Sequence, residues 1–228
     1  MPIIYIEGNI GTGKSTFIEN LKTYLDFFND LNYDTHVILE PVNEWLQTKD
    51  SSGENILQKF YENQEQWAFT FQMNSFISRV KKIQETFYNN NNGKEKLVFV
   101  ERSIYTDRQC FAKLCYENGK MNELEYNIYC KWNDWLSEQF NIKPDSYIYL
   151  RCPPNENEKR IKERSRDSEE GIPLDYLKAL HEKHDEWMNF EKESVPVYIV
   201  DAMRNFKDYD EMTKIVMEFL LHYYVIFL

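Results

Sequence analysis

Cysteine is scarce in this sequence, and long apolar runs are missing. The four cysteines show no C-x-x-C spacing, so they predict reduced thiols inside a core instead of a disulfide framework or a zinc site. No stretch approaches the roughly 18 consecutive apolar residues of a membrane-spanning helix. No basic segment precedes the Gly-rich stretch near the N-terminus, so we expect no secretion signal. These features favour a cytoplasmic protein that binds no membrane.

Basic residues are also in short supply, because 27 lysines and arginines stand against 38 aspartates and glutamates, for a net charge of −11. Proteins that bind nucleic acids or anionic membranes need a basic surface, so both classes are disfavoured. Any phosphate site must therefore be local. Hydrophobic residues make up 42% of the chain, which is enough for a large core and excludes wholesale disorder.

Short apolar runs alternate with longer segments of helical periodicity. We expect strands over residues 3–7, 35–40, 97–101, 147–151 and 197–201. We expect helices over residues 14–28, 64–88, 105–117, 123–140, 155–165, 174–193 and 209–224. This alternation predicts an α/β protein with a five-stranded parallel sheet flanked by helices. Because no Pro/Gly-rich linker divides the chain, we expect a single domain over residues 1–228, with a mobile lid at about 155–173.

Residues 8–15, Gly-Asn-Ile-Gly-Thr-Gly-Lys-Ser, match the phosphate-loop motif G-x-x-x-x-G-K-[ST] in full. The motif follows an expected strand and opens an expected helix, which is the context that a phosphate loop requires. Its lysine reaches the β- and γ-phosphates, and its serine offers a hydroxyl to Mg²⁺. The motif therefore predicts a site for a nucleoside triphosphate with Mg²⁺, but it does not indicate what accepts the phosphate. The residues expected at the phosphates are Gly8, Asn9, Gly11, Gly13, Lys14, Ser15 and Thr16.

Charged side chains stand where two of the expected strands end. Glu40 ends the second strand, while Glu101 and Arg102 end the third, and ligands of open α/β sheets bind beyond such ends. Glu40 could orient or deprotonate an attacking hydroxyl. Glu101 can hold magnesium through its waters, and Arg102 can steady the transferring phosphoryl group. The ordinary alternatives are a surface charge at Glu40 and a structural ion pair at Glu101 and Arg102.

The long helix expected over residues 64–88 carries Gln72, Ser75 and Arg79 on one face. A buried glutamine presents a donor and an acceptor side by side, which suits the Watson–Crick edge of a base. Asp107, in the turn after the third strand, could pair with Arg79. By pattern alone, an aromatic helix face is more often ordinary core than a binding site, and Gln72 alone would be interpreted as a surface residue.

Arginines cluster in the expected lid. Arg160 and Arg164 share a helix face because they lie four residues apart, and Arg166 follows closely. Such a face can close over a triphosphate and supply positive charge to the transition state. The alternative is a solvated helix with many ion pairs.

Several motifs in register make the chain similar to the deoxyribonucleoside kinase family. The matching stretches cover residues 8–16 (GNIGTGKST), 40–45 (EPVNEW), 55–72, 101–111 (ERSIYTDRQCF), 160–187 and 195–208. The resemblance runs over nearly the whole chain, and it implies a P-loop kinase fold with an Arg-rich lid that binds ATP and Mg²⁺. It implies transfer of the γ-phosphate of ATP to the 5′-hydroxyl of a deoxynucleoside, in nucleotide salvage, by a homodimer formed through helices such as that expected over residues 64–88.

The resemblance also implies roles for individual residues. Glu40 would be the general base at the 5′-hydroxyl, with Arg102 beside it, and Gln72 would read the base edge. The base ring would be enclosed by Trp45, Phe71 and Phe111, and the sugar 3′-hydroxyl would be held by Tyr61 and Glu169. ATP would be bound by the lid arginines Arg160, Arg164 and Arg166, and its adenine would lie near Arg204 and Phe206.

Arg79 and Asp107 bear on the choice of base. Arg79 can donate to a purine O6 or N7, and Asp107 can accept from an exocyclic amine, whereas a thymine methyl would meet polar groups. The pair is similar to that of the deoxycytidine and deoxyguanosine/deoxyadenosine kinases. We therefore expect a deoxycytidine- or purine-type enzyme and not a thymidine kinase.

Two other functions fit parts of the pattern. A thymidylate-type nucleoside monophosphate kinase shares the phosphate loop, the sheet and the lid, but Glu40 would repel the phosphate of its acceptor. A nucleotide-dependent switch without transfer activity is the second alternative, although the guanine-reading N-K-x-D motif is absent.

We predict that Lys14→Ala abolishes turnover, because it removes the positive charge that compensates the transferring phosphates. The measurement is ADP release in the presence of ATP and a deoxynucleoside. Near-normal release would contradict the role given to this lysine.

Overall fold

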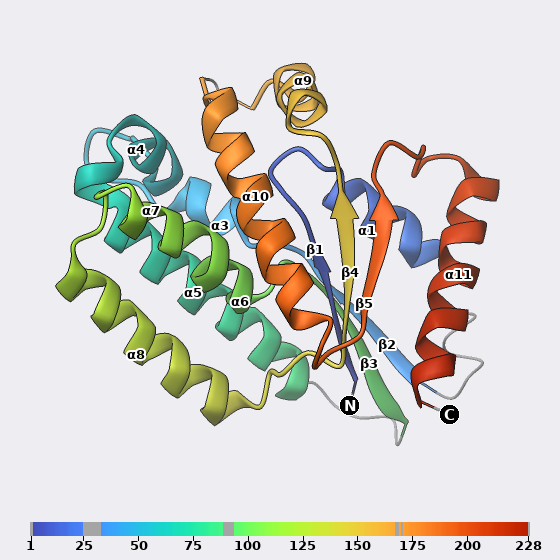
Figure 1. Ribbon diagram of the computed structural model, residues 1–228. Helices are drawn as coiled ribbons and strands as arrows, with labels where there is room; N and C mark the ends of the chain where they lie inside the picture. The colour runs from blue at the N-terminus through green and yellow to red at the C-terminus, as the bar shows by residue number, and fades with distance from the viewer. Residues whose placement is uncertain (1, 25–32, 89–93, 167–168, 170, 228) are drawn as a thin grey trace.

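Five parallel strands form the centre of the structure (Figure 1). The computed structural model describes residues 2–24, 33–88, 94–166, 169 and 171–227. The strands are β1 (Ile3–Glu7), β2 (Tyr33–Ile38), β3 (Glu95–Glu101), β4 (Ser146–Arg151) and β5 (Val197–Asp201). They lie in the order β2-β3-β1-β4-β5, and each neighbouring pair is parallel. The predicted five-stranded parallel sheet is therefore confirmed.

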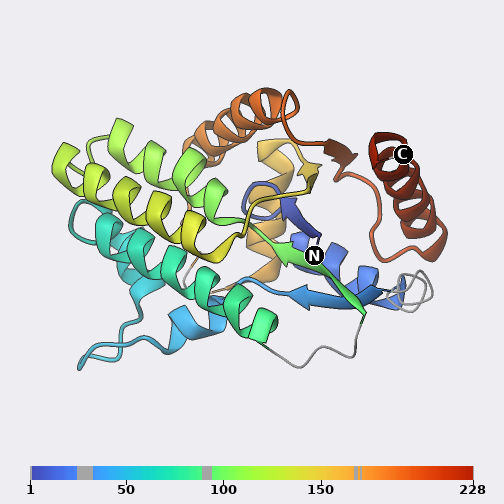
Figure 2. The ribbon, with the colours of Figure 1, turned by 90° about the horizontal axis from the view of Figure 1, so that it is seen from below.

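Helices cover both faces of the sheet (Figure 2). On one face lie α1 (Lys14–Leu21), the short 3₁₀ helix η1 (Lys22–Tyr24) and α11 (Tyr209–Phe227). The larger layer contains α3 (Val42–Gln47), α4 (Ile56–Glu62), α5 (Gln64–Tyr88), α6 (Ile104–Thr106), the π-helical turn η2 (Asp107–Ala112), α7 (Lys113–Glu117), α8 (Glu123–Phe140) and α10 (Leu174–Glu191). The lid helix α9 (Pro154–Arg164) lies above the carboxyl end of β4 (Figure 1).

The sheet is buried from both sides, so its strands are apolar at consecutive positions. In β1, Ile3 and Tyr5 pack into the core beneath α5 and α10, while Ile4 and Ile6 pack against α1 and α11. This division follows from the alternation of side chains along a strand. It explains why the strands read as nearly continuous apolar runs in the sequence.

The order of the strands places the phosphate loop at a switch point. From β1 the chain crosses to β2 on one side, and from β3 it crosses past β1 to β4 on the other. Connections that diverge in this way leave a crevice beyond the carboxyl ends of β1 and β3. The loop after β1, the turn after β3 and the segment after β2 all lead into that crevice.

Several predicted boundaries are wrong. Strand β2 ends at Ile38 and not at residue 40, so Glu40 belongs to a turn in which Pro41 directly precedes α3. The helix expected over residues 14–28 changes to 3₁₀ geometry at Lys22, and residues 25–28 lie outside the described part. The helix expected over residues 105–117 is divided by the π-helical turn η2. Helices α3 and α4 were not predicted, because they are too short to show a clear period.

Candidate active site

The loop between β1 and α1 is shaped by glycines with positive φ. Gly11 has φ +77°, and a Cβ there would lie 2.6 Å from the carbonyl oxygen of Asn157 in α9. The absence of a side chain at Gly11 therefore lets the lid helix pack directly on the loop. Lys14 is buried, and its Nζ donates to the carbonyl oxygens of Gly8 (3.1 Å) and Asn9 (2.8 Å). Burial, with Arg102 nearby, lowers the pKa of the Lys14 amine to about 7.

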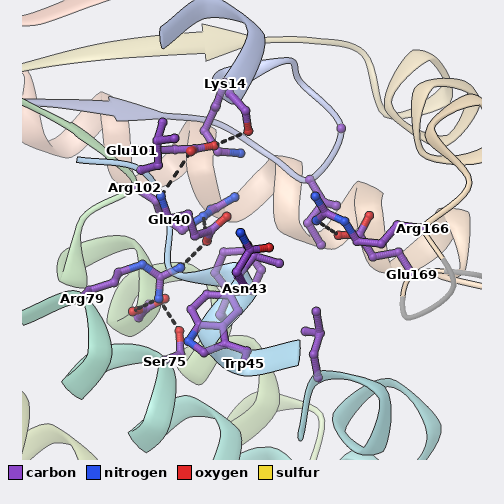
Figure 3. Close-up of a pocket in the computed structure, with 18 of the residues that line it drawn as sticks. Lys14, Glu40, Asn43, Trp45, Ser75, Arg79, Glu101, Arg102, Arg166 and Glu169 are labelled. Carbon is purple, nitrogen blue, oxygen red and sulfur yellow. Dashed lines mark hydrogen bonds and ion pairs between the residues drawn. The ribbon is translucent and has the colours of Figure 1, made fainter. Parts of the chain in front are cut away.

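A cavity of about 330 Å³ opens in front of this loop (Figure 3). Its lining draws on the phosphate loop, the ends of β2 and β3, the buried face of α5, η2 and the lid. The residues of the predicted site that line it are Gly11, Gly13, Lys14, Ser15, Thr16, Glu40, Trp45, Tyr61, Phe71, Gln72, Arg79, Glu101, Arg102, Asp107, Phe111, Arg164, Arg166 and Glu169. Side chains that are far apart in the sequence thus meet in one space.

Glu40 lies at the centre of this lining, between two arginines (Figure 3). Its carboxylate accepts hydrogen bonds from Nη2 of Arg79 and, at 3.1 Å, from Nε of Arg102. Burial alone would raise the pKa of Glu40, but Arg102, Arg79 and Lys14 outweigh it and hold this pKa well below its ordinary value. Glu40 is therefore an ionised acceptor across the physiological range.

Arg79 extends the same network to the far end of the cavity. Its Nη1 donates to Asp107 at 2.7 Å and also to the hydroxyl of Ser75, so the expected pairing of Arg79 with Asp107 is confirmed. Burial raises the pKa of Asp107 to about 7, although Arg79 and Arg102 act in the opposite direction. Gln72, only 1% exposed, lines the cavity from the same helix. This end of the cavity thus presents hydrogen-bonding groups of several kinds.

Aromatic rings form the walls between these polar groups. Trp45 and Phe71 meet edge to face, with ring centroids 5.4 Å apart, and Phe60 stacks on Phe71 at 4.6 Å. Phe111 also lines the cavity, and the Arg102 guanidinium lies 4.7 Å from the centroid of its ring. A cavity lined by aromatic rings suits a planar base.

Oxygen donors suited to magnesium stand beside the phosphate loop. Ser15 Oγ donates to Glu101 Oε1 at 2.7 Å, and the backbone N–H of Glu40 donates to Glu101 Oε2 at 3.2 Å. Among the described residues there is no group of three His, Cys, Asp or Glu side chains that could enclose a metal ion. One hydroxyl and one carboxylate fit an ion such as Mg²⁺, which keeps several of its waters and binds nucleotide phosphates.

The lid contributes opposite charges to the mouth of the cavity. Glu169, buried at the rim, accepts hydrogen bonds from Arg164 and, at 2.7 Å, from Arg166. Arg160 lies outside the lining and bridges Glu156 (3.0 Å) and the carbonyl oxygen of Thr12 (3.2 Å). It therefore contacts the phosphate loop from the side of α9.

Four other predicted residues also lie outside the lining. Gly8 precedes the bend of the loop, and Asn9 ties the loop to α10 through a 2.7 Å hydrogen bond to the carbonyl oxygen of Leu177. Arg204 forms ion pairs with Glu211 (2.8 Å) and Glu218 (3.1 Å) of α11, so its guanidinium is engaged there. A Cβ at Gly13 would lie 3.6 Å from the ring of Phe206, which places this ring beside the loop.

Some lining residues were not predicted. Asn43, Leu57 and Phe60 all face the cavity from α3 and α4, the helices that the sequence pattern did not reveal. Phe60 belongs to one of the stretches that resemble the kinase family, which was the one available signal for it.

A phosphate loop, lid arginines and a polar-ended aromatic slot that contains a carboxylate define a nucleoside-type phosphotransferase. The family model "Deoxynucleoside kinase" matches residues 4–222. The chain is 40% identical to a deoxycytidine kinase of Rattus norvegicus and 38% identical to that of Homo sapiens, each match covering 95% of this chain and 90% of the relative. It is 33% identical to a mitochondrial deoxyguanosine kinase of Xenopus laevis, over 89% of this chain and 82% of the relative.

The chain therefore belongs to the deoxynucleoside kinase family and is an ATP-dependent phosphotransferase that acts on deoxynucleosides. The resemblance inferred from the motifs is confirmed. The thymidylate-kinase alternative is set aside, because the relatives are kinases of nucleosides and not of nucleotides.

We predict that ATP binding at pH 8 takes up roughly one proton, because the Lys14 amine, with its lowered pKa, is mostly neutral before the triphosphate arrives and charged afterwards. Titration calorimetry in buffers of different ionisation enthalpy measures this uptake. Lys14→Arg, which stays charged, is the control and should bind without it. Equal heats in all buffers for the unaltered protein would contradict the prediction.

Proposed function

We propose that this kinase phosphorylates deoxycytidine or purine deoxynucleosides in preference to thymidine. The observation that carries the proposal is the buried Arg79–Asp107 pair at 2.7 Å, which lines the cavity together with Gln72. An exocyclic amine finds an acceptor in Asp107, and a ring nitrogen or carbonyl finds donors in Gln72 and Arg79. The thymine methyl has no apolar partner among these three groups.

We further propose that Glu40 is the general base for the 5′-hydroxyl. Its carboxylate lines the same cavity as the phosphate loop, and Arg102 donates to it at 3.1 Å. Phosphoryl transfer proceeds through a loose transition state, so a base of low pKa suffices if the proton leaves the hydroxyl late. Lys14 and Arg102 would compensate the negative charge of the transferring group.

The contact between Arg79 and Glu40 supports a link between base binding and chemistry. Arg79 holds Glu40 with one terminal nitrogen and Asp107 with the other. When a base engages Arg79, Glu40 would lose one of the charges that depress its pKa and would become a stronger proton acceptor.

Ser15 and Glu101 are the residues that we propose for Mg²⁺, which would neutralise charge on the β- and γ-phosphates.

For the substrate sugar, we propose that Glu169 and Tyr61 bind the 3′-hydroxyl, because both line the cavity beside the lid. The lid arginines Arg160, Arg164 and Arg166 would then approach the triphosphate when residues 155–173 close over it. That the adenine of ATP lies near Arg204 and Phe206 stays a prediction.

We propose a homodimer formed through α8 and α5, which run side by side (Figure 2). An apolar stripe is exposed on these helices, comprising Leu124 (69%), Ile128 (38%), Trp132 (47%) and Trp135 (50%) on α8 and Ile77 (47%) on α5. Exposed apolar side chains on neighbouring helices are typical of an interface between copies of a chain.

We propose the cytoplasm as the compartment of this enzyme. All four cysteines are unpaired thiols, which fits a reducing environment. No helix within the described ranges has the length and apolar character to cross a membrane.

We predict that deoxycytidine or a purine deoxynucleoside exceeds thymidine in kcat/KM by about tenfold or more, from the difference in hydrogen bonding to the base. The four common deoxynucleosides are compared at fixed ATP by ADP release. Thymidine as the best substrate would overturn the assignment of base.

We predict that Glu40→Gln lowers kcat about 10²–10⁴-fold, with a modest loss of deoxynucleoside binding, because the amide cannot accept the hydroxyl proton. Glu44→Gln is a matched control, since Glu44 lies on α3 away from the cavity lining and should keep normal turnover. A near-normal kcat in the Glu40 variant would remove the role of general base.

We predict that Trp132→Glu converts a dimer into a monomer, because a charge would be buried in the apolar interface. Sedimentation velocity measures the assembly. Phe190→Glu, at a residue of α10 that is 71% exposed, is the control and should leave the dimer intact. A Trp132 variant that sediments with the unaltered protein would contradict this interface.

A further inference from the structure

One buried carboxylate near the active site has no part in the chemistry described above. Glu7 ends β1, is fully buried and does not line the cavity. Its Oε1 accepts a hydrogen bond from the backbone N–H of Ser103 at 2.9 Å, and its Oε2 accepts one from the hydroxyl of Thr106. Glu7 thus ties β1 to the turn that follows β3.

The residue inside that turn has an unusual backbone. Arg102 has φ +63°, a left-handed conformation that residues with a Cβ rarely adopt and that persists only where the surroundings hold it. The backbone N–H of Arg102 donates to the carbonyl oxygen of Ile6 at 3.0 Å, and that of Ser103 donates to Glu7. Two consecutive residues of β1 therefore hold the chain on both sides of this conformation.

This backbone directs the Arg102 side chain. Its Nε lies 3.1 Å from Glu40, and its guanidinium lies against the ring of Phe111. A relaxed turn with negative φ would point the side chain elsewhere. We propose that Glu7 is a positioning residue, which holds Arg102 in the left-handed conformation and so sets its guanidinium against Glu40.

As a negative charge, Glu7 also stabilises Arg102. Burial lowers the pKa of Arg102, but the carboxylates around it, Glu40 first and Glu7 second, together outweigh burial, so the net shift is upward. The competing explanation is that Glu7 only stabilises the fold of this turn. Ser103, which donates to Glu7, also caps α6, because its hydroxyl accepts from the N–H of Thr106 at 3.2 Å. The proposal for Glu7 rests on the catalytic role proposed for Arg102, and the experiment distinguishes a failure of one from a failure of the other.

The test compares Thr106→Val with Thr106→Ser. Valine keeps the shape but cannot donate to Glu7, whereas serine keeps the hydroxyl. We expect valine to lower kcat about 10–100-fold, as small misplacements of a reacting group do, with little change in KM, and serine to restore most of it. Glu7→Gln, which keeps an acceptor for Ser103 but loses the charge and the acceptor for Thr106, should also lower kcat.

Tyr5→Phe is the matched control. It removes another buried hydrogen bond of β1, the 2.8 Å bond from the Tyr5 hydroxyl to the carbonyl oxygen of Ile142. Its melting temperature should fall about as far as that of Thr106→Val, with kcat unchanged.

Two results would overturn the proposal: a kcat for Thr106→Val equal to that of Tyr5→Phe, or an equal loss in the valine and serine variants. Arg102→Ala, made alone and with Thr106→Val, separates this failure from failure of the proposed function. If Glu7 acts through Arg102, the second change costs little more than Arg102→Ala alone. A normal kcat in Arg102→Ala would instead refute the catalytic role of that arginine.

Discussion

The active site depends on one buried arrangement of charges, the carboxylate of Glu40 held between Arg79 and Arg102. Taking ionised groups out of water is costly, and the cost is offset only when opposite charges meet with good geometry and their remaining hydrogen bonds are made. Here each arginine comes from a different element, α5 and the turn after β3, and Glu40 follows β2. The packing of these three elements therefore decides whether the charges compensate one another, and an error in any of them would leave a buried ion unpaired.

In the function proposed above, the same arrangement joins recognition to chemistry. A single guanidinium, that of Arg79, contacts both Asp107, which we propose for base recognition, and Glu40, which we propose as the general base. Lys14, buried beside the phosphate loop, completes the positive side of the network. Because burial strengthens electrostatic interactions, a ligand that engages one member changes the environment of the others. One member of this network, Arg102, has a left-handed backbone, as is common for strained backbone at functional sites.

Much of the fold was predictable because its signals are local. The strand from Ile3 to Glu7 and that from Val197 to Asp201 were predicted at their observed bounds, since each is an apolar run that follows a proline and ends at a carboxylate. The misplaced end of β2 has a clear cause: Leu39 continues the apolar run, but the sheet pairing stops at Ile38, one residue earlier. Helices α3 and α4 were not predicted from the sequence, because each is short and derives its stability from tertiary packing. The π-helical turn at Asp107–Ala112 has no signature in residue pattern.

The amino-acid sequence by itself determined the alternation of strands and helices, the phosphate loop and the family, because periodicity and motif spacing are properties of neighbouring residues. The tertiary structure alone decided that Arg79 contacts Glu40 as well as Asp107, that Arg204 turns to α11, and that Glu7 holds the turn around Arg102. The physical reason is that the contacts of Arg79 and Glu7 join residues separated by several elements, and that those of Arg204 depend on how its loop folds back onto the helix that follows. Their distances follow from how the sheet, the helices and the loops pack, which no local pattern records.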